Sequence, residues 1–210
     1  MKFLIILLAA AGILAVPAHA QPKKLERNVE KQRAAVEAWT ACIADEFPDD
    51  VANFLETDYR SDGYSRMASD LTQRRVSERC FNAMPRAYRR IELGGLPFAG
   101  GLAERMIERG DVPLLKRLSM AAIGREAQTF SYTDQIASCM TRGAPHLVAK
   151  LFDTPINSPD EAAALAELEP VKQVCTSQGK PLEASPLAMR SMLATAAFRL
   201  LEAQKVTDDA

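Results

Sequence analysis

Four cysteines, Cys42, Cys80, Cys139 and Cys175, are the residues whose spacing most clearly predicts chemistry in this chain. Cys42 and Cys80 enclose 37 residues and Cys139 and Cys175 enclose 35, so nearly the same spacing occurs twice. The sequence contains no Cys-x-x-Cys arrangement, which is the spacing typical of a redox-active dithiol. It therefore predicts two structural disulfides, Cys42–Cys80 and Cys139–Cys175, with no metal bound by these thiols.

Other side chains that perform catalysis do not fall into a recognisable motif. His146 is the single histidine after residue 20, so a histidine-based metal site is not expected. No serine lies in a Gly-x-Ser-x-Gly or Ser-x-x-Lys pattern, and the glycine pairs at 94–95 and 100–101 lack the residues of a phosphate-binding loop. The sequence thus identifies no catalytic, cofactor-binding or metal-binding residue, and we expect binding without a cofactor rather than catalysis.

Charge is segregated in the first half of the chain. Residues 45–58 contain six acids and no base, whereas residues 74–90 contain six arginines and one acid, Glu78. The simplest interpretation is that the two segments neutralise each other across the predicted disulfide. The alternative is an arginine face that binds an anionic ligand or an acidic partner. Its candidate residues are Arg74, Arg75, Arg86, Arg89 and Arg90.

Two further functions remain open from the sequence. Acids of residues 45–58 could form a carboxylate-dependent hydrolase, which requires two carboxyl groups with different pKa values in one cleft. An apolar cavity between the two halves of the chain, lined by residues such as Leu115, Phe130 and Phe198, could instead bind a small apolar molecule.

The N-terminus indicates the compartment. Met1 and Lys2 precede an apolar run from Phe3 to Val16, and the small-residue pattern Pro17-Ala18-His19-Ala20 follows. This arrangement is typical of a secretory signal peptide, here residues 1–20 with cleavage after Ala20. The sequence therefore predicts a periplasmic or secreted protein, in a compartment where disulfides persist.

The charge balance limits the partners. Removal of residues 1–20 would leave 25 basic and 27 acidic residues, a net charge of −2 with histidine neutral. A nucleic-acid binder usually carries a basic excess, so nucleic acid is not an expected partner. No later apolar run is long enough to span a membrane. We expect the partner to be another envelope or secreted protein.

The segments that position these residues are predicted to be helical throughout. Apolar residues recur at helical spacing and no segment alternates as a strand would, which indicates an all-α fold. An offset of 97 residues aligns Cys42 with Cys139, Pro48 with Pro145 and Thr57 with Thr154. We therefore predict two disulfide-stapled helical-bundle repeats packed together. Their ranges are 21–110 and 131–210, joined by a connecting helix over 111–130.

Local signals predict several helix ends. Pro48 and Pro145 should each open a short helix after a corner, ending near Thr57 and Thr154. Ser158-Pro159-Asp160-Glu161 is a capping-box pattern, and Ser185-Pro186 should open a last helix that runs to about Gln204. Pro170 is expected to split the preceding segment, 159–178, into two short helices.

Overall fold

A computed structural model describes residues 27–74, 79–80, 95–176 and 179–205, except for the side chain of residue 74. Within these ranges all the regular structure is helical, as the sequence predicts. The predicted signal peptide and Arg75, Arg86, Arg89 and Arg90 lie outside the described residues. The elements are α1 (Val29–Glu46), α2 (Pro48–Glu56), α3 (Asp62–Ser69), the π-helical turn η1 (Asp70–Arg74), α5 (Gly95–Glu108), α6 (Leu114–Ala122), α7 (Tyr132–Gly143), α8 (Pro145–Phe152), α9 (Pro159–Thr176) and α10 (Pro186–Lys205).

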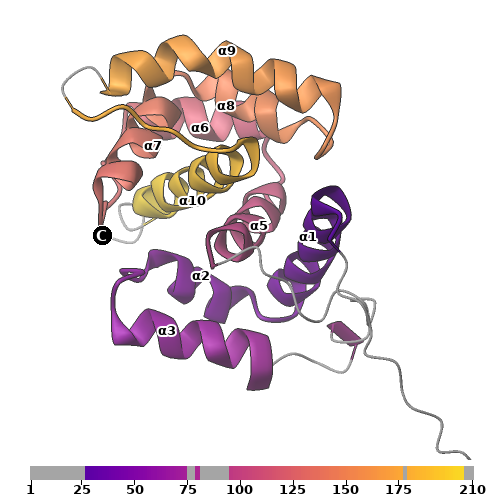
Figure 1. The fold of residues 1–210 in the computed structure, drawn as a ribbon. Helices are drawn as coiled ribbons and strands as arrows, with labels where there is room; N and C mark the ends of the chain where they lie inside the picture. Colours follow the sequence, from indigo (N-terminus) through magenta and orange to yellow (C-terminus); the bar gives the residue numbers. More distant parts are fainter. Residues whose placement is uncertain (1–26, 75–78, 81–94, 177–178, 206–210) are drawn as a thin grey trace, which may run out of the picture.

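Two central helices, α5 and α10, pack directly on each other, with α1 against α5 and α7 against α10 (Figure 1). Gly100 of α5 faces Ser191 of α10, and a Cβ atom at position 100 would overlap the serine side chain. Gly101 faces Thr40 of α1 in the same way. These two glycines therefore allow α5 to approach both neighbours closely.

The hydrophobic core is one cluster that both halves of the chain share. Ile43, Phe54 and Leu102 from the first half and Leu151 and Leu193 from the second are almost fully buried in it. None of the helices in the described ranges combines the length and the apolar character that a membrane span needs.

Both disulfides form as the cysteine spacing predicts. Cys42 of α1 is bonded to Cys80, with the two Cα atoms 5.5 Å apart. Cys139 of α7 is bonded to Cys175 of α9, with a Cα separation of 5.9 Å. Two disulfides are consistent with a protein that lies outside the cytoplasm.

The two predicted proline corners have closely similar backbones. Phe47, between α1 and α2, has φ −130° and ψ 53°, and Ala144, between α7 and α8, has φ −142° and ψ 60°. The Phe47 N–H donates to the Ile43 carbonyl at 2.9 Å, and the Ala144 N–H donates to the Met140 carbonyl at 3.0 Å. In both cases the next residue is a proline at the first helical position, which needs no N–H partner.

The serine caps predicted for the second half also form. Ser158 Oγ accepts the Glu161 N–H at 3.1 Å, and Ser185 Oγ accepts the Ala188 N–H at 3.2 Å. The carboxylate of Glu161 does not complete a capping box, however, because it binds other groups in the protein interior. The helix that Ser185 opens, α10, ends at Lys205, close to the predicted residue.

Two predictions about helix lengths require correction. The helix α9 continues through Pro170 as one element, although a proline inside a helix costs about 3 kcal/mol. Packing on α7 and α8, together with the Cys175 disulfide, holds both sides of this proline in place. The helix in the connecting segment is α6, which covers only Leu114–Ala122, and Gly124 follows close to its end.

Candidate functional site

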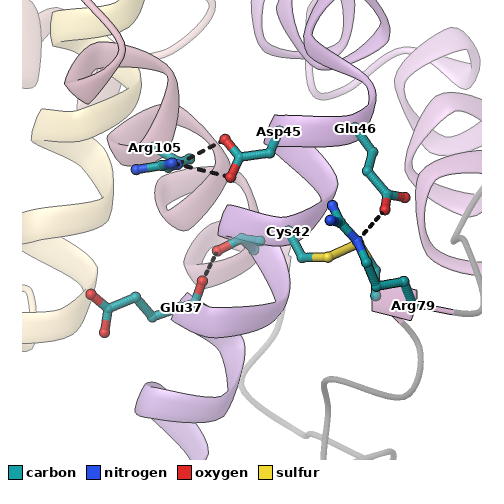
Figure 2. The surroundings of a disulfide bond; sticks show 8 residues. Glu37, Cys42, Asp45, Glu46, Arg79 and Arg105 are labelled. Atoms are coloured by element: carbon teal, nitrogen blue, oxygen red, sulfur yellow. Dashed lines mark hydrogen bonds and ion pairs between the residues drawn. A yellow bond between two sulfur atoms is a disulfide. The ribbon is translucent and has the colours of Figure 1, made fainter.

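Three acids of the acidic segment 45–58, Asp45, Glu46 and Asp58, form ion pairs among the described residues. Figure 2 shows the surroundings of the Cys42–Cys80 disulfide, where Asp45 pairs with Arg105 at 2.9 Å and Glu46 with Arg79 at 2.7 Å. The hydrogen bonds from Arg105 hold the pKa of Asp45 below its usual value. The Glu46–Arg79 pair joins the acidic segment to the arginine segment, as mutual neutralisation requires. Asp45 is instead neutralised by Arg105 of α5, which lies outside the arginine segment.

The remaining acids of residues 45–58 do not form a described catalytic pair. Asp58 is paired with Arg60 at 2.9 Å. The pKa of Glu56 is raised by partial burial and by the nearby charge of Glu202, which itself pairs with Lys205. Glu56 and Glu202 line a shallow cavity of about 210 Å³, but no second acid from residues 45–58 lines it. The hydrolase alternative therefore gains no carboxylate pair from this segment.

One cluster with metal-ligand geometry occurs at the first disulfide. The ligand atoms of Cys42, Cys80 and Glu46 lie within 4.8 Å of one another. The two sulfurs are bonded to each other and so offer no thiolate, which is the form that binds metals. We assign no metal to this cluster.

A buried ionic network connects the two halves of the molecule. Glu161 at the start of α9 accepts bidentate hydrogen bonds from Arg33 of α1, one of them at 2.7 Å, and another from Arg190 of α10 at 3.1 Å. Arg190 also pairs with Glu104 of α5 through both carboxylate oxygens, with Nε–O distances of 3.1 and 3.0 Å. The side chains of Arg33, Glu161 and Arg190 are all less than a tenth exposed.

Backbone groups complete this network. Asn157, with φ 58°, donates its N–H to Glu161 at 2.9 Å. Arg190 donates to the Leu151 carbonyl at 3.2 Å and to the Thr154 carbonyl at 3.1 Å, near the end of α8. Burial alone would raise the pKa of Glu161, but the hydrogen bonds and charge of Arg33 lower it overall. A buried network with all its partners in place is typical of a structural element.

A small cavity of about 90 Å³ lies beside this network, lined by α1, α5 and α10. Glu37 is at its exposed rim, and the structure gives its carboxylate no hydrogen bond among the described residues. Desolvation by the surrounding protein and the nearby charge of Glu104 raise the pKa of Glu37. Ser191 also lines this cavity, but its hydroxyl donates to the Leu187 carbonyl at 2.8 Å and has no base beside it among the described contacts. A single carboxyl group with a raised pKa, without an activated nucleophile, does not make a catalytic site.

A larger groove of about 650 Å³ lies between α5, α6 and α10, which we call the α6 groove. Its lining includes apolar side chains from all three helices, namely Met106, Ile107, Met120, Ala121, Phe198 and Leu201. Met120 is 63% exposed, and Leu115 of α6 and Ile123, which directly follows this helix, are exposed as well. Exposed apolar side chains that cluster beside a groove are one sign of an interaction surface.

Two arginines line the α6 groove without forming a salt bridge among the described residues, although the charge of Arg109 helps to lower the pKa of Asp45. Arg109 donates to the Ala44 carbonyl at 2.9 Å. Arg117 donates to the Val112 carbonyl at 2.8 Å and to the Ile107 carbonyl at the end of α5. A Cβ atom at Gly110 would overlap the guanidinium of Arg117. Lys205 and Glu202 compensate each other, so the groove keeps an excess of positive charge.

The structure places the sequence-predicted site residues as follows. Leu115, Phe130 and Phe198 do not share a described cavity: Leu115 is exposed on α6, Phe130 lies under Arg199 at 4.8 Å, and Phe198 lines the α6 groove. His146 is exposed on α8. The ionic network was missed by sequence reasoning. Its one available signal was Arg190, which is the single charged residue in the first half of α10.

No family model, curated protein or solved structure matches the chain.

Proposed function

We propose that this protein is a non-catalytic binding module of the cell envelope or secreted space, and that its α6 groove holds an acidic amphipathic segment of another exported protein. The observation that carries this proposal is the combination of an open apolar groove with two arginines that form no salt bridge among the described residues. An apolar groove between helices accommodates the apolar face of a partner helix. The methionines on its walls can adapt to different apolar contacts.

Charge selects the kind of segment. Arg109 and Arg117 give the groove an excess of positive charge, so acidic residues that flank an apolar face would gain charge-assisted hydrogen bonds at its rim. A basic segment would meet like charge. The occupant that fits is therefore apolar on one face and acidic along its borders.

The proposed location follows from the N-terminal pattern and the disulfides. A cleaved signal peptide over residues 1–20 would deliver the chain to an oxidising compartment. Both disulfides would persist there without enzymatic reduction. An intact mass of the exported protein that matches a chain beginning at Gln21 would support this location, and a mass that includes residues 1–20 would contradict it.

We also propose that the two halves are copies of one ancestral unit. The two proline corners support this proposal, as do the serine caps at positions 61 and 158, which accept the N–H groups of Tyr64 and Glu161 at 3.1 Å each. These equivalent positions are all 97 residues apart. The α5–α10 contact joins Gly100 to Ser191, which correspond at the offset of 91 that aligns Leu102 with Leu193. Contact between equivalent residues is expected at an approximate two-fold axis.

Site-specific photo-crosslinking tests the groove. A benzoylphenylalanine replaces Met120 in the groove or, as the control, Val29 on α1, whose exposure of 60% is similar. In the producing cells we expect a partner that crosslinks through position 120 and not through position 29. Mass spectrometry then identifies the crosslinked segment, and a synthetic peptide of that segment is titrated against the purified protein.

The proposal predicts that the peptide is acidic and apolar and that Met120→Asp weakens its binding at least about tenfold. Val29→Asp should leave the affinity unchanged, and added salt should weaken binding because the rim contacts are ionic. A basic peptide, equal crosslinking at both positions, or equal affinity for the Met120→Asp variant would each overturn the proposal.

A further inference from the structure

A second cavity lies against both central helices, at a position equivalent to that of the small cavity beside the ionic network. This cavity has a volume of about 280 Å³, against about 90 Å³ for the first. The residues of α5 and α10 that line the two cavities correspond at the offset of 91. Leu96 corresponds to Leu187, Ala99 to Arg190, and Glu104 to Thr195.

Three replacements favour a larger second cavity, while Met192 and Arg199 stand where the first cavity has Gly101 and Glu108. Beside the first cavity, the Arg190 side chain reaches Glu104 and Glu161 and fills the space between them. In the second cavity, Ala99 stands where Arg190 would be, and Thr195 stands where Glu104 would be. Tyr64 occupies the position that corresponds to Glu161. One long cation and two carboxylates have thus been exchanged for smaller or neutral side chains, and the space is left open.

The wall of this cavity is mainly apolar and aromatic. Tyr64 is held by stacking on Phe54, with the ring centroids 4.3 Å apart. Burial raises the pKa of Tyr64 to about 12, so the hydroxyl remains a hydrogen-bond donor at neutral pH. The structure gives this hydroxyl no hydrogen bond among the described residues. The Thr195 hydroxyl, by contrast, donates to the Met192 carbonyl at 2.9 Å.

The charged residues of the cavity already neutralise each other. Arg199 pairs with Asp134 at 3.1 Å, and both side chains are less than a fifth exposed. Arg199 also donates to the Leu55 carbonyl at 2.7 Å and lies over the Phe130 ring. A charged ligand would therefore be buried without a counter-charge, which is unfavourable.

We propose that this tyrosine-lined cavity, formed by Tyr59, Tyr64, Leu96, Ala99, Met192 and Thr195, binds a neutral aromatic molecule of about two fused rings that carries one hydrogen-bonding group. The size follows from volume, because an apolar cavity of about 150 Å³ holds a single benzene ring. The hydrogen-bonding group pairs with the Tyr64 hydroxyl. This site is separate from the α6 groove and does not depend on it.

Calorimetric titration of the full exported chain with 2-naphthol, which is neutral at neutral pH, tests the site. We expect saturable one-to-one binding in the micromolar range. Ala99→Leu fills the cavity and should weaken binding at least about tenfold. Ala41→Leu adds the same atoms to the first cavity and should leave the affinity unchanged. Tyr64→Phe removes only the hydroxyl and should weaken binding about two- to tenfold.

Further arms keep the test decisive. Circular dichroism checks the fold of each variant, and Leu96→Trp, at a partly exposed position of the same cavity, replaces Ala99→Leu if that variant does not fold. Met120→Asp should bind 2-naphthol as the wild type does, so failure of the groove proposal and failure of this one are distinguishable. No saturable binding up to about 1 mM, an equal affinity for 2-naphthoate, or equal losses for Ala41→Leu and Ala99→Leu would overturn the inference.

Discussion

Substitution of Glu161 by glutamine should destabilise the protein strongly, because this carboxylate is the negative centre of the buried ionic network. Glutamine keeps the shape of glutamate and removes its charge. Arg190 would retain Glu104 as a partner. Arg33 would keep an uncharged amide oxygen at position 161 and the Asn157 Oδ1 atom, at 3.3 Å, while its side chain is 8% exposed. The variant therefore leaves one buried arginine charge without a hydrogen-bonded carboxylate.

The expected loss follows from that geometry. Removal of one partner from a buried ion pair costs about 3–5 kcal/mol, since the remaining charge is neither hydrated nor compensated. A matched control is Glu167→Gln, which makes the same change in the Lys150–Glu167 pair, where the side chains are 52% and 45% exposed. An exposed pair contributes about 0.2–1 kcal/mol. The two variants should thus differ by at least about 2 kcal/mol.

Urea denaturation followed by far-UV circular dichroism measures both free energies of unfolding. The pH dependence gives a second readout. The folded-state pKa of Glu161 is lowered from 4.5, so its stabilisation is complete above that value and is lost as the pH falls through the lowered pKa. The gap between wild type and Glu161→Gln should therefore be largest near neutral pH and shrink in acid. Losses within about 1 kcal/mol of each other for Glu161→Gln and Glu167→Gln at neutral pH would refute the reasoning.

Three further predictions concern the fold. Replacing either cysteine pair by serines should lower the free energy of unfolding by about 4 kcal/mol, because the two bridges close chain segments of 38 and 36 residues. A loss below about 1 kcal/mol for either pair in urea denaturation would contradict this. In an alkaline absorbance titration Tyr64 should ionise near pH 12, because burial raises its pKa, and this step should be absent from the curve of Tyr64→Phe. The contribution of Tyr64 to the free energy of unfolding is complete below pH 10 and falls as the pH rises from 10 to about 12. Unfolding in urea should have the same midpoint by the fluorescence of Trp39, the single tryptophan, and by far-UV circular dichroism, because one core and the ionic network join both halves. Two separate midpoints would argue for independent units.

Local chemistry explains why much of the fold was predictable from the sequence. A proline fixes its own φ and lacks an N–H, so Pro48 and Pro145 open helices wherever their neighbours permit. Serine caps at Ser158 and Ser185 act over three residues and depend little on the rest of the molecule. The cysteine spacing indicated the pairing because each bridge lies within one half of the chain.

Long-range contacts overrode the local signals in the places where the predictions failed. Pro170 was expected to end a helix, but the packing of α9 on α7 and α8 and the Cys139–Cys175 bridge hold the chain helical on both sides of it. The predicted lining of an apolar cavity failed for a related reason. Helical periodicity indicates that Leu115 and Phe198 belong to apolar faces, but it does not indicate which faces meet.

The sequence by itself determined the helical class, the two disulfides and several helix boundaries, because these depend on residues that are close in the chain or on cysteine spacing. Only the tertiary structure decided which charges pair and where space remains. Arg33 meets Glu161 across 128 residues, and Arg190 meets Glu104 across 86. The tyrosine-lined cavity likewise depends on Ala99 and Thr195 facing each other from different helices. Such arrangements follow from how the helices pack, which no local pattern specifies.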